Sequence, residues 1–579
     1  MTQTVKQILK EELAHLTDGL SFDVLTPPDP KLGDYSTNAA FILGKKEGKK
    51  PVDVASEMKE KLANSHIATM FDIQVAPNGF LNFFAKLEFL QKQLDEISKD
   101  EKYGENEEGK GKKVIVEYSS PNIAKPMHIG HLRSTIIGDS LANVYDKLGY
   151  EVIRWNYIGD WGTQFGKLIA AWKKWGWGDK EELEIHPIRE MLKLYVKFHD
   201  ELKNNPDLEK EGQKEFKKLE NSDVENREIW ERFRKVSIGE FTKTYTELSI
   251  GEFQITKGES DYEPNLKPLI EELQKKDLAK ESEGALIIEL ENMPPMMLRK
   301  TDGATLYATR DIASLEDRIT NYHPDKILYV VANQQALHFE QLFAVAKKLD
   351  WTEPELVHVK FGMVLGEDGK KLATREGKVV PLQEVIDKVT DMARDTVKQK
   401  NSDLSGEEMD RVAHVVAIGA LKYNDLKQHP YSDIEFDWKA MLDLSGNSGP
   451  YIQYTYARLQ SILHRSMNQE TGIMADTSKL NEPSELRLMR QLLDYPEAIQ
   501  ECAECDALNG LALYLYDLAH LANQFYEQVH VLEDNKDERP AFAKASADKR
   551  EARLLLIQTV SRILKDGLGL LGIETLERI

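Results

Sequence analysis

VIVEYSSPNIAKPMHIGHLRS, the segment from Val114 to Ser134, decides the fold of this chain. Its first three residues form an apolar run that predicts a buried β-strand. A loop that contains Pro121 and Pro126 follows, and apolar residues then recur at helical spacing, at Leu132, Ile136, Leu141, Val144 and Leu148. This order of strand, loop and helix start is typical of phosphate-binding sites. The first backbone N–H groups of a helix lack partners and lie at the positive end of its dipole.

Two histidines stand where this helix is predicted to begin. His128 and His131 flank Gly130 in an H-x-G-H pattern. Imidazoles here can donate to oxygens that gain charge during displacement at phosphorus, and a glycine lets a flat purine approach the backbone. A single histidine at a helix start is more often a cap or a surface residue. Two of them after a strand and a proline-bounded loop favour a nucleotidyl-transfer site.

The composition is that of a soluble chain with several domains. Its 579 residues are enough for about three to four domains. No apolar run reaches the ~18–20 residues of a membrane span and no export signal is visible, so we expect a cytoplasmic protein with no membrane partner. The net charge of −22 argues against a general nucleic-acid coat protein but allows a local basic face. Cys502 and Cys505 are the only cysteines, too few for a four-cysteine zinc site, so no metal site is predicted.

Strand and helix patterns divide the chain into four predicted regions. Residues 1–107 resemble a small α/β domain. Residues 108–395 alternate between strand and helix, which predicts a Rossmann-type, doubly wound parallel sheet with further strands at Glu151–Tyr157, Lys326–Ala332 and His358–Val364. Within them, the Lys- and Glu-rich residues 178–235 are predicted to be a helical insertion with solvated faces. Residues 396–448 are expected to be a helical connector and residues 449–579 an all-helical domain.

A lysine-rich loop follows the last predicted strand. GEDGKKLATREGKVV contains three glycines and the cations Lys370, Lys371 and Arg375. Such a loop can close over a triphosphate, neutralise charge during displacement and then open. Alone it would more often be a surface turn; together with the histidines it supports a nucleotide site.

A third group of residues suits a guanidinium ligand. Tyr307 and Asp311 are four residues apart, so on a helix they share one face, and Glu259 could add a second carboxylate. A carboxylate accepts two parallel N–H bonds from a planar guanidinium. The alternative is that Asp311 caps its helix or pairs with Arg310 or Arg318.

Taken together, the motifs resemble those of a class I aminoacyl-tRNA synthetase, specifically an arginyl-tRNA synthetase. SSPNIAKPMHIGHLRSTIIGD and NYIGDWGTQFG are similar to the catalytic signatures of that family. GDYSTNAAFILGKK and APNGFLNFF resemble its N-terminal added tRNA-binding domain, and SGNSGPYIQYTYARLQSI and GLGLLGIETLERI resemble its helical anticodon-binding domain. The resemblance implies an arginine–tRNA ligase that activates L-arginine with ATP and transfers it to tRNA(Arg), with tRNA required for activation. It also implies a monomer, and Mg²⁺ that arrives with ATP rather than at a dedicated protein site.

The resemblance assigns residues position by position. For catalysis it implies His128, His131, Lys125 and Lys371, and for ATP binding His128, Gly130, His131, Met363, Val364 and Lys371. For arginine it implies Ser120, Asn122, Glu259, Tyr307, Asp311 and Gln335. For the anticodon loop it implies Tyr451, Tyr454 and Arg458, where aromatic stacking suits single-stranded bases.

The lysine-rich loop departs from the class pattern KMSKS. The second lysine is replaced by Thr374, and Lys125 before the histidines is expected to supply that charge. Two other classes remain open: a small nucleotidyltransferase that shares the histidine pattern, and a catalytically silent relative that only binds RNA. The former would have no use for the helical tail, and the latter would be expected to have lost catalytic residues.

Overall fold

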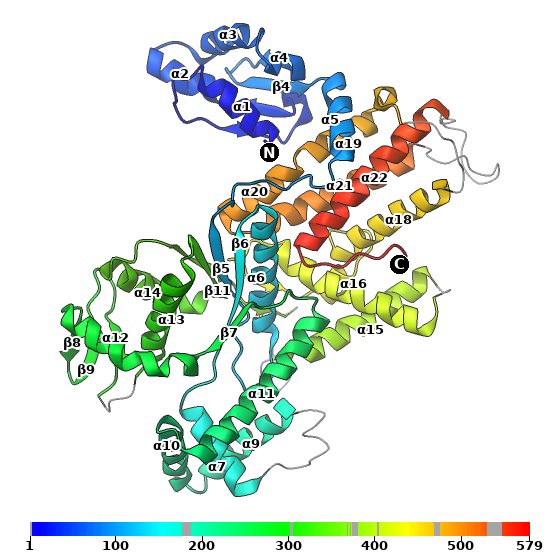
Figure 1. Cartoon of the computed structure of the whole chain (residues 1–579). Helices are drawn as coiled ribbons and strands as arrows, with labels where there is room; N and C mark the ends of the chain where they lie inside the picture. The colour runs from blue at the N-terminus through cyan, green and yellow to red at the C-terminus, as the bar shows by residue number, and fades with distance from the viewer. Residues whose placement is uncertain are drawn as a thin grey trace.

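We describe the protein from a computed structural model. It covers residues 3–176, 187–301, 305–366, 369–370, 372, 380–401, 404–467, 475–529 and 547–579. Figure 1 shows an N-terminal domain, a central sheet domain with two lateral lobes, and a helical C-terminal part. Among the described helices, none combines the length and the apolar character needed to span a membrane.

The N-terminal domain is a four-stranded antiparallel sheet covered by helices. Its strand order is β1-β2-β4-β3, with β1 Val24–Leu25, β2 Tyr35–Thr37, β4 Leu81–Ala85 and β3 Phe71–Val75. The helices are α1 Val5–Ala14, α2 Ala39–Glu47, α3 Pro51–Leu62, α4 Ile67–Met70 and α5 Leu87–Lys99, with the short helix η1 at Pro30–Leu32. α5 packs on helices of the C-terminal part, so this domain is anchored far from its place in the sequence (Figure 1).

The central sheet confirms the predicted Rossmann-type architecture. Five parallel strands lie in the order β12-β11-β5-β6-β7: β12 Glu355–Phe361, β11 Lys326–Ala332, β5 Lys113–Glu117, β6 Glu151–Ile158 and β7 Ile255–Gly258. Alternate residues of β5 face opposite layers: Val114 and Val116 pack toward α6 (Ile129–Lys147), and Ile115 packs toward the other face. The chain leaves β5 toward β6 and later returns to the other side of β5 with β11. The switch point of the sheet therefore lies between β5 and β11.

The strand predicted over His358–Val364 is wrong in its bounds. β12 ends at Phe361 because the next residues bond to a distant segment: Gly362 N donates to Pro430 O at 3.1 Å, and Met363 N donates to Asp433 Oδ1 at 2.6 Å. A Cβ on Gly362 would be 2.5 Å from Ser432 O, so this approach requires glycine. The chain then forms β13 (Val364–Leu365), which pairs with β14 (Ile434–Glu435).

The helical insertion is larger than predicted and has its own core. It consists of α7 Thr163–Trp175, α9 Pro187–Leu202, α10 Asp207–Glu220 and α11 Val224–Glu247, and thus extends beyond residues 178–235 at both ends. Phe165, Phe198 and Phe233 are almost fully buried in it. A Cβ on Gly166 would overlap the backbone oxygen of Gly212, so α7 and α10 pack unusually closely. Solvated faces are therefore only part of its structure.

A second lobe covers the other face of the sheet. It contains η2 Glu259–Tyr262, α12 Glu263–Lys275, a small antiparallel sheet of β8 Ala279–Ser282, β9 Ala285–Ile288 and β10 Met296–Arg299, and then α13 Tyr307–Tyr322, η3 Asn333–Gln335 and α14 Ala336–Lys348. These helices share a hydrophobic cluster with Ile115, Ile153 and Ile327 of the central strands.

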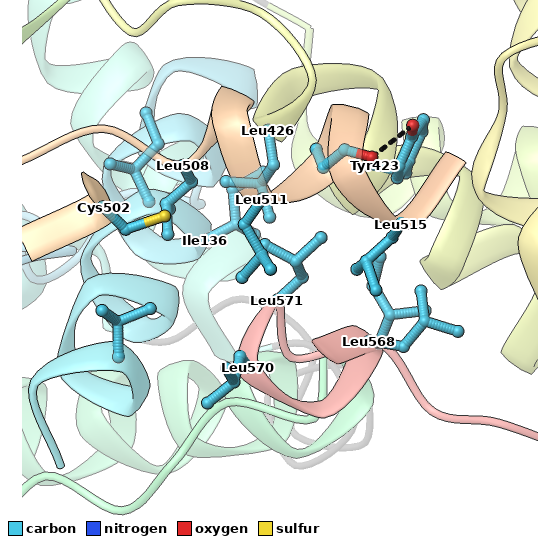
Figure 2. Close-up of a cluster of buried hydrophobic side chains, with 14 of the residues drawn as sticks. Ile136, Tyr423, Leu426, Cys502, Leu508, Leu511, Leu515, Leu568, Leu570 and Leu571 are labelled. Carbon is cyan, nitrogen blue, oxygen red and sulfur yellow. Dashed lines mark hydrogen bonds between the residues drawn. The ribbon is translucent and has the colours of Figure 1, made fainter. Parts of the chain in front are cut away.

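The C-terminal part is helical and packs on α6. Its elements are α15 Leu382–Lys400, α16 Gly406–Leu426, α17 Trp438–Met441, α18 Gly449–Met467, η4 Thr477–Lys479, α19 Pro483–Leu493, α20 Tyr495–Cys505, α21 Asn509–Gln528 and α22 Ala547–Leu570. The domain edge predicted at residue 395 falls inside α15. Figure 2 shows Ile136 of α6 among leucines at the start of α21 and the end of α22, with Leu426 of α16. The central sheet domain and the helical part thus share one core.

Candidate active site

A cavity of about 580 Å³ opens at the carboxyl ends of the central strands, at the switch point of the sheet. All six residues predicted to bind arginine line it. They come from four places: the loop after β5 (Ser120, Asn122), η2 after β7 (Glu259), the first turns of α13 (Tyr307, Asp311) and η3 after β11 (Gln335). The fold brings together side chains that lie more than 200 residues apart in the sequence.

The loop after β5 is held in an unusual backbone conformation. Ser119, Ser120 and Ala124 have positive φ angles of 69°, 46° and 61°. Gly159 N donates to Pro121 O at 3.0 Å, and a Cβ on Gly159 would overlap Asn122 Oδ1. The close approach of this glycine holds Asn122 at the cavity edge. Positive φ in non-glycine residues is strained and occurs often at functional sites.

Two buried hydroxyl groups of the cavity are available to bind a ligand. Ser120 Oγ and the hydroxyl of Tyr157 have no hydrogen-bond partner within the described part of the chain. Burying a hydroxyl without a hydrogen bond costs about 1–3 kcal/mol, so a ligand that bonds to them would recover this energy.

The acidic wall of the cavity is formed by Asp311 and Glu259. His338 Nε2 lies 2.6 Å from Asp311 Oδ2, and because a carboxylate only accepts, the imidazole donates this bond. Burial, and then the negative charge of Asp311, raise the pKa of Glu259 to about 7. The ring of Tyr307 lies 4.9 Å from that of His338 and is 56% exposed, so it forms the rim of the site. A cation is the ligand that would stabilise both carboxylates.

The arginines near Asp311 have other partners. Arg318 forms a buried ion pair with Glu117, and its guanidinium lies 4.6 Å from the ring centroid of Trp155. Arg310 Nε donates to Glu263 Oε1 at 2.8 Å. The alternative in which Asp311 pairs with Arg310 or Arg318 is therefore wrong.

His128 and His131 form the N-terminus of α6, as predicted. His128 is the N-cap, and its Nδ1 accepts from Gly130 N at 3.1 Å; His131 Nδ1 accepts from His128 N at 3.1 Å. Because each Nδ1 accepts a backbone N–H, the proton of each neutral ring is on Nε2. Burial, and then the neighbouring His128, lower the pKa of His131 to about 3. His131 can therefore act as a neutral donor toward a phosphate oxygen, and the Nε2–H of His128 is a second donor beside it.

The lysine-rich loop is anchored beside the histidines. Ile129 N donates to Val380 O at 3.3 Å, and Leu382 N donates to Met127 O at 3.0 Å. At the other end of the loop, Leu372 N donates to Val364 O at 2.9 Å. Lys371 and Arg375 lie outside the described residues.

The other predicted nucleotide contacts differ in exposure. Met363 is 38% exposed, but Val364 is 5% exposed, so a contact from Val364 to ATP would have to use its backbone. Lys125 is exposed in the loop after β5, and its Nζ lies 5.8 Å from the ring centroid of Tyr195 on α9.

The residues predicted to contact the anticodon loop lie on α18 beside α21. Arg458 lies 5.1 Å from the ring centroid of Tyr454, and donates to Asn523 Oδ1 at 2.8 Å. Tyr451 is 9% exposed and accepts from Asn523 Nδ2 at 3.1 Å, so its ring supports this surface from beneath. The part of this surface formed by α21 was not predicted, although Tyr516, His520 and Asn523 recur at helical spacing on that helix.

One residue of the cavity lining, His338, and one residue outside the lining, Asp160, were also not predicted. His338 comes three residues after Gln335, and Asp160 lies in the motif GDWG; both are almost fully buried polar groups. A histidine on the polar side of a helix start and an acid between glycine and tryptophan were the available signals. Among the described residues, no group of three or more His, Cys, Asp and Glu side chains is arranged to hold a metal ion.

Comparisons with family models cover most of the chain. Residues 93–438 match the model described as tRNA synthetases class I (R), catalytic domain. Residues 452–579 match the DALR anticodon binding domain, and residues 3–85 match the arginyl tRNA synthetase N terminal domain.

Individual proteins are similar over nearly their whole length. Arginine–tRNA ligase from Halothermothrix orenii is 39% identical over 585 residues, with 100% of this chain and 98% of that protein covered. Arginine–tRNA ligase 1 from Bacillus cereus is 40% identical over 558 residues, covering 96% of this chain and 95% of that protein. The crystal structure of arginyl-tRNA synthetase from Plasmodium falciparum has a TM-score of 0.81 at 28% identity, with 99% and 98% of the two chains covered. The Thermus thermophilus arginyl-tRNA synthetase has a TM-score of 0.80 at 27% identity, with 99% and 100% covered.

Proposed function

This chain belongs to the arginyl-tRNA synthetase family, and from that premise we propose how its residues perform the reaction. It is an arginine–tRNA ligase that uses ATP to join L-arginine to tRNA(Arg). In the first step the carboxylate oxygen of arginine bonds to the α-phosphorus of ATP, and pyrophosphate leaves. In the second step a terminal ribose hydroxyl of the tRNA attacks the arginyl carbonyl, loses its proton, and AMP leaves.

One observation supports arginine as the amino acid: Asp311 and Glu259 place two carboxylates in one cavity at the switch point of the sheet. A guanidinium offers several N–H donors in one plane and can bond to two carboxylates at once. We assign the side chain of arginine to Asp311, Glu259 and Tyr307. Ser120 and Asn122 then lie where they can hold its α-amine and α-carboxylate, with Gln335 as a further contact.

The histidine pair is assigned to ATP. The Nε2–H groups of His128 and His131 donate to phosphate oxygens, and the start of α6 adds the positive end of the helix dipole. Gly130 allows the adenosine to approach the backbone, and Met363 and Val364 form its further boundary. Because the reaction needs no protein nucleophile, these groups act by orientation and by stabilising charge.

Positive charge at the α-phosphate is assigned to Lys125 and Lys371. Lys125 is exposed in the loop after β5, close to the histidines in sequence, which supports its role as the replacement for the second lysine of the loop. Mg²⁺ is proposed as a companion of the ATP phosphates, where it would neutralise the departing pyrophosphate, and not as a ligand of a protein site.

The tRNA is assigned to the two ends of the chain. We propose that residues 1–107 bind the body of the tRNA and that residues 449–579 bind its anticodon loop through Tyr454 and Arg458, supported by Tyr451. Stacking on aromatic rings and on a guanidinium suits splayed bases. We further propose that the protein is a cytoplasmic monomer and that tRNA must bind before arginine is activated.

The decisive experiment offers the purified protein all twenty amino acids with total tRNA and ATP. We expect only arginine to become attached to tRNA. Charging of another amino acid would overturn the assignment of the cavity, and no charging at all would favour the silent relative. Arginine-dependent ATP–pyrophosphate exchange, measured with and without tRNA, tests the proposed order of binding.

A further inference from the structure

Asp160 is a fully buried carboxylate between the helical insertion and the arginine cavity. It lies in the loop after β6 with 0% of its surface exposed. Ser260 N donates to its Oδ1 at 2.9 Å, and Ser260 Oγ donates to its Oδ2 at 2.8 Å. Within the described residues its charged donor is Arg234, whose Nε donates to Oδ2 at 2.9 Å. Asp160 therefore ties η2 to helix α11.

Arg234 also donates a hydrogen bond to a second residue of η2. Its Nη2 donates to Asp261 Oδ2 at 3.3 Å, and the same oxygen accepts from Gly258 N at 2.7 Å. Trp230, one turn earlier on α11, donates through Nε1 to the backbone oxygen of Asp160 at 2.8 Å. One face of α11 thus holds both the loop after β6 and the short helix η2.

Glu259 is the first residue of η2 and precedes Ser260 directly. Its carboxylate accepts a bond from the backbone N–H of Trp161, the residue after Asp160. Ser260 follows Glu259 in the chain, and Trp161 donates to its carboxylate. The positions of both therefore depend on Asp160 and, through it, on Arg234. A shift of the Asp160 carboxylate would move the residues on which the Glu259 position depends.

We propose that Arg234 is a positioning residue for arginine recognition, acting through Asp160 and Ser260 on Glu259. This inference rests on the proposed assignment of Glu259 to the arginine side chain. It gives the helical insertion a part in selecting the amino acid, although α11 contributes no residue to the cavity lining.

The charge balance supports the same conclusion. Burial is the main cause of the raised pKa of Glu259, and the negative charges of Asp311 and then Asp160 add to it. Arg234 neutralises Asp160, and a buried carboxylate that loses its partner either takes up a proton or shifts toward water. Both responses would disturb η2 without touching the ATP side of the site.

The test compares Arg234→Met and Arg234→Lys with the unchanged enzyme in aminoacylation at saturating tRNA. We expect Arg234→Met to raise the KM for arginine about tenfold and to leave the KM for ATP within about twofold. Arg234→Lys keeps a charged donor for Asp160 and should remain within about threefold of the original KM. Lys235→Met, on the exposed side of the same helix, is the matched control and should change neither constant. A KM for ATP that rises in parallel would mean a general structural defect and would overturn the inference.

A double-mutant cycle separates this inference from the proposed function. If Arg234 acts through Glu259, Arg234→Met should change the KM for arginine by less than about twofold in a Glu259→Gln background. An equal effect in both backgrounds would overturn the inference and leave the arginine site intact. An unchanged KM in Glu259→Gln alone would overturn the role of Glu259 itself, and with it the route we propose.

Discussion

The affinity for arginine should depend on pH through Glu259. The raised pKa of this carboxyl, about 7, comes first from burial and then from the charge of Asp311. A guanidinium remains protonated at every pH at which the protein is folded, so it favours the ionised carboxylate. Acidic conditions protonate Glu259 before arginine arrives, and the ligand must then displace that proton. Affinity should therefore rise as pH increases through 7.

The size of the effect follows from the fraction of ionised carboxyl. With a pKa of about 7, about one molecule in eleven has an ionised Glu259 at pH 6 and about ten in eleven at pH 8. If arginine binds only the ionised form, the dissociation constant falls about tenfold over this range. Asp311→Asn removes the second cause of the raised pKa of Glu259. The midpoint of the pH dependence of arginine affinity should therefore move to lower pH in this variant, although the variant binds arginine more weakly.

Isothermal titration of arginine into the enzyme between pH 6 and pH 8 measures this dependence. Glu259→Gln is the matched control, since any ionisation of the ligand itself affects both proteins equally. We expect the variant to bind arginine more weakly and to lose the tenfold change. A flat profile in the original enzyme, or the same slope in Glu259→Gln, would refute the reasoning.

Three other substitutions test separate parts of the structure. His131→Ala should lower arginine-dependent ATP–pyrophosphate exchange about a hundredfold and leave tRNA affinity unchanged in filter binding, because one oriented donor is lost; near-normal exchange would contradict this. Arg133→Met leaves Asp425 buried without its ion-pair partner, both being at most 3% exposed. This substitution should lower the free energy of unfolding by about 3–5 kcal/mol, which is measured as a lower thermal unfolding midpoint. Burial raises the pKa of Asp494 to about 6, so its protonated folded form stabilises the protein at low pH, and this stability is lost as pH rises through 6. Asp494→Asn still accepts the bond from Tyr35, so its unfolding midpoint should change less between pH 5 and pH 7.5.

The parts of the fold that depend on local pattern could be predicted. The apolar run before the histidines lies in β5, the helix begins directly after His128, and the strand expected over Lys326–Ala332 has those bounds. These elements follow from residue spacing and from the burial of a central parallel strand. For each of these elements, the residue pattern that predicts it lies within the segment itself.

The errors arose where distant segments compete for the backbone. β12 ends early because Gly362 and Met363 bond to residues near Pro430 and Asp433, about 70 positions later. No local sequence pattern indicates that the backbone here bonds to a distant segment instead of to the sheet. The same holds for Asp160, whose donors lie 74 and 100 residues away on different elements.

Spacing and chemistry suggested Tyr307, Asp311 and Glu259 for a guanidinium, and the resemblance added Ser120, Asn122 and Gln335 to the proposed arginine site. Residues from four separate elements meet in one cavity, and composition alone would not have selected them. Once the fold is known, the physical signals are clear: unpaired hydroxyls on Ser120 and Tyr157 within the described chain, and an acid whose pKa is raised. These signals require the three-dimensional structure, because they depend on burial and on the distances between side chains.

The pairing of Glu117 with Arg318 explains how this cavity can be selective. Three carboxylates line it, but Arg318 already neutralises Glu117 and is fixed between the rings of Trp155 and Tyr329. Two acids therefore remain for a ligand with a single positive charge, and Glu259 is only partly ionised near neutral pH. A neutral analogue of arginine would leave both acids without a cation in a largely buried site, where an unpaired charge is costly. The compact ammonium of lysine cannot bond to two separated carboxylates in one plane, as a guanidinium can. If Asp311 and Glu259 bind the arginine side chain as proposed, selectivity comes mainly from the acids that a wrong amino acid would leave unpaired.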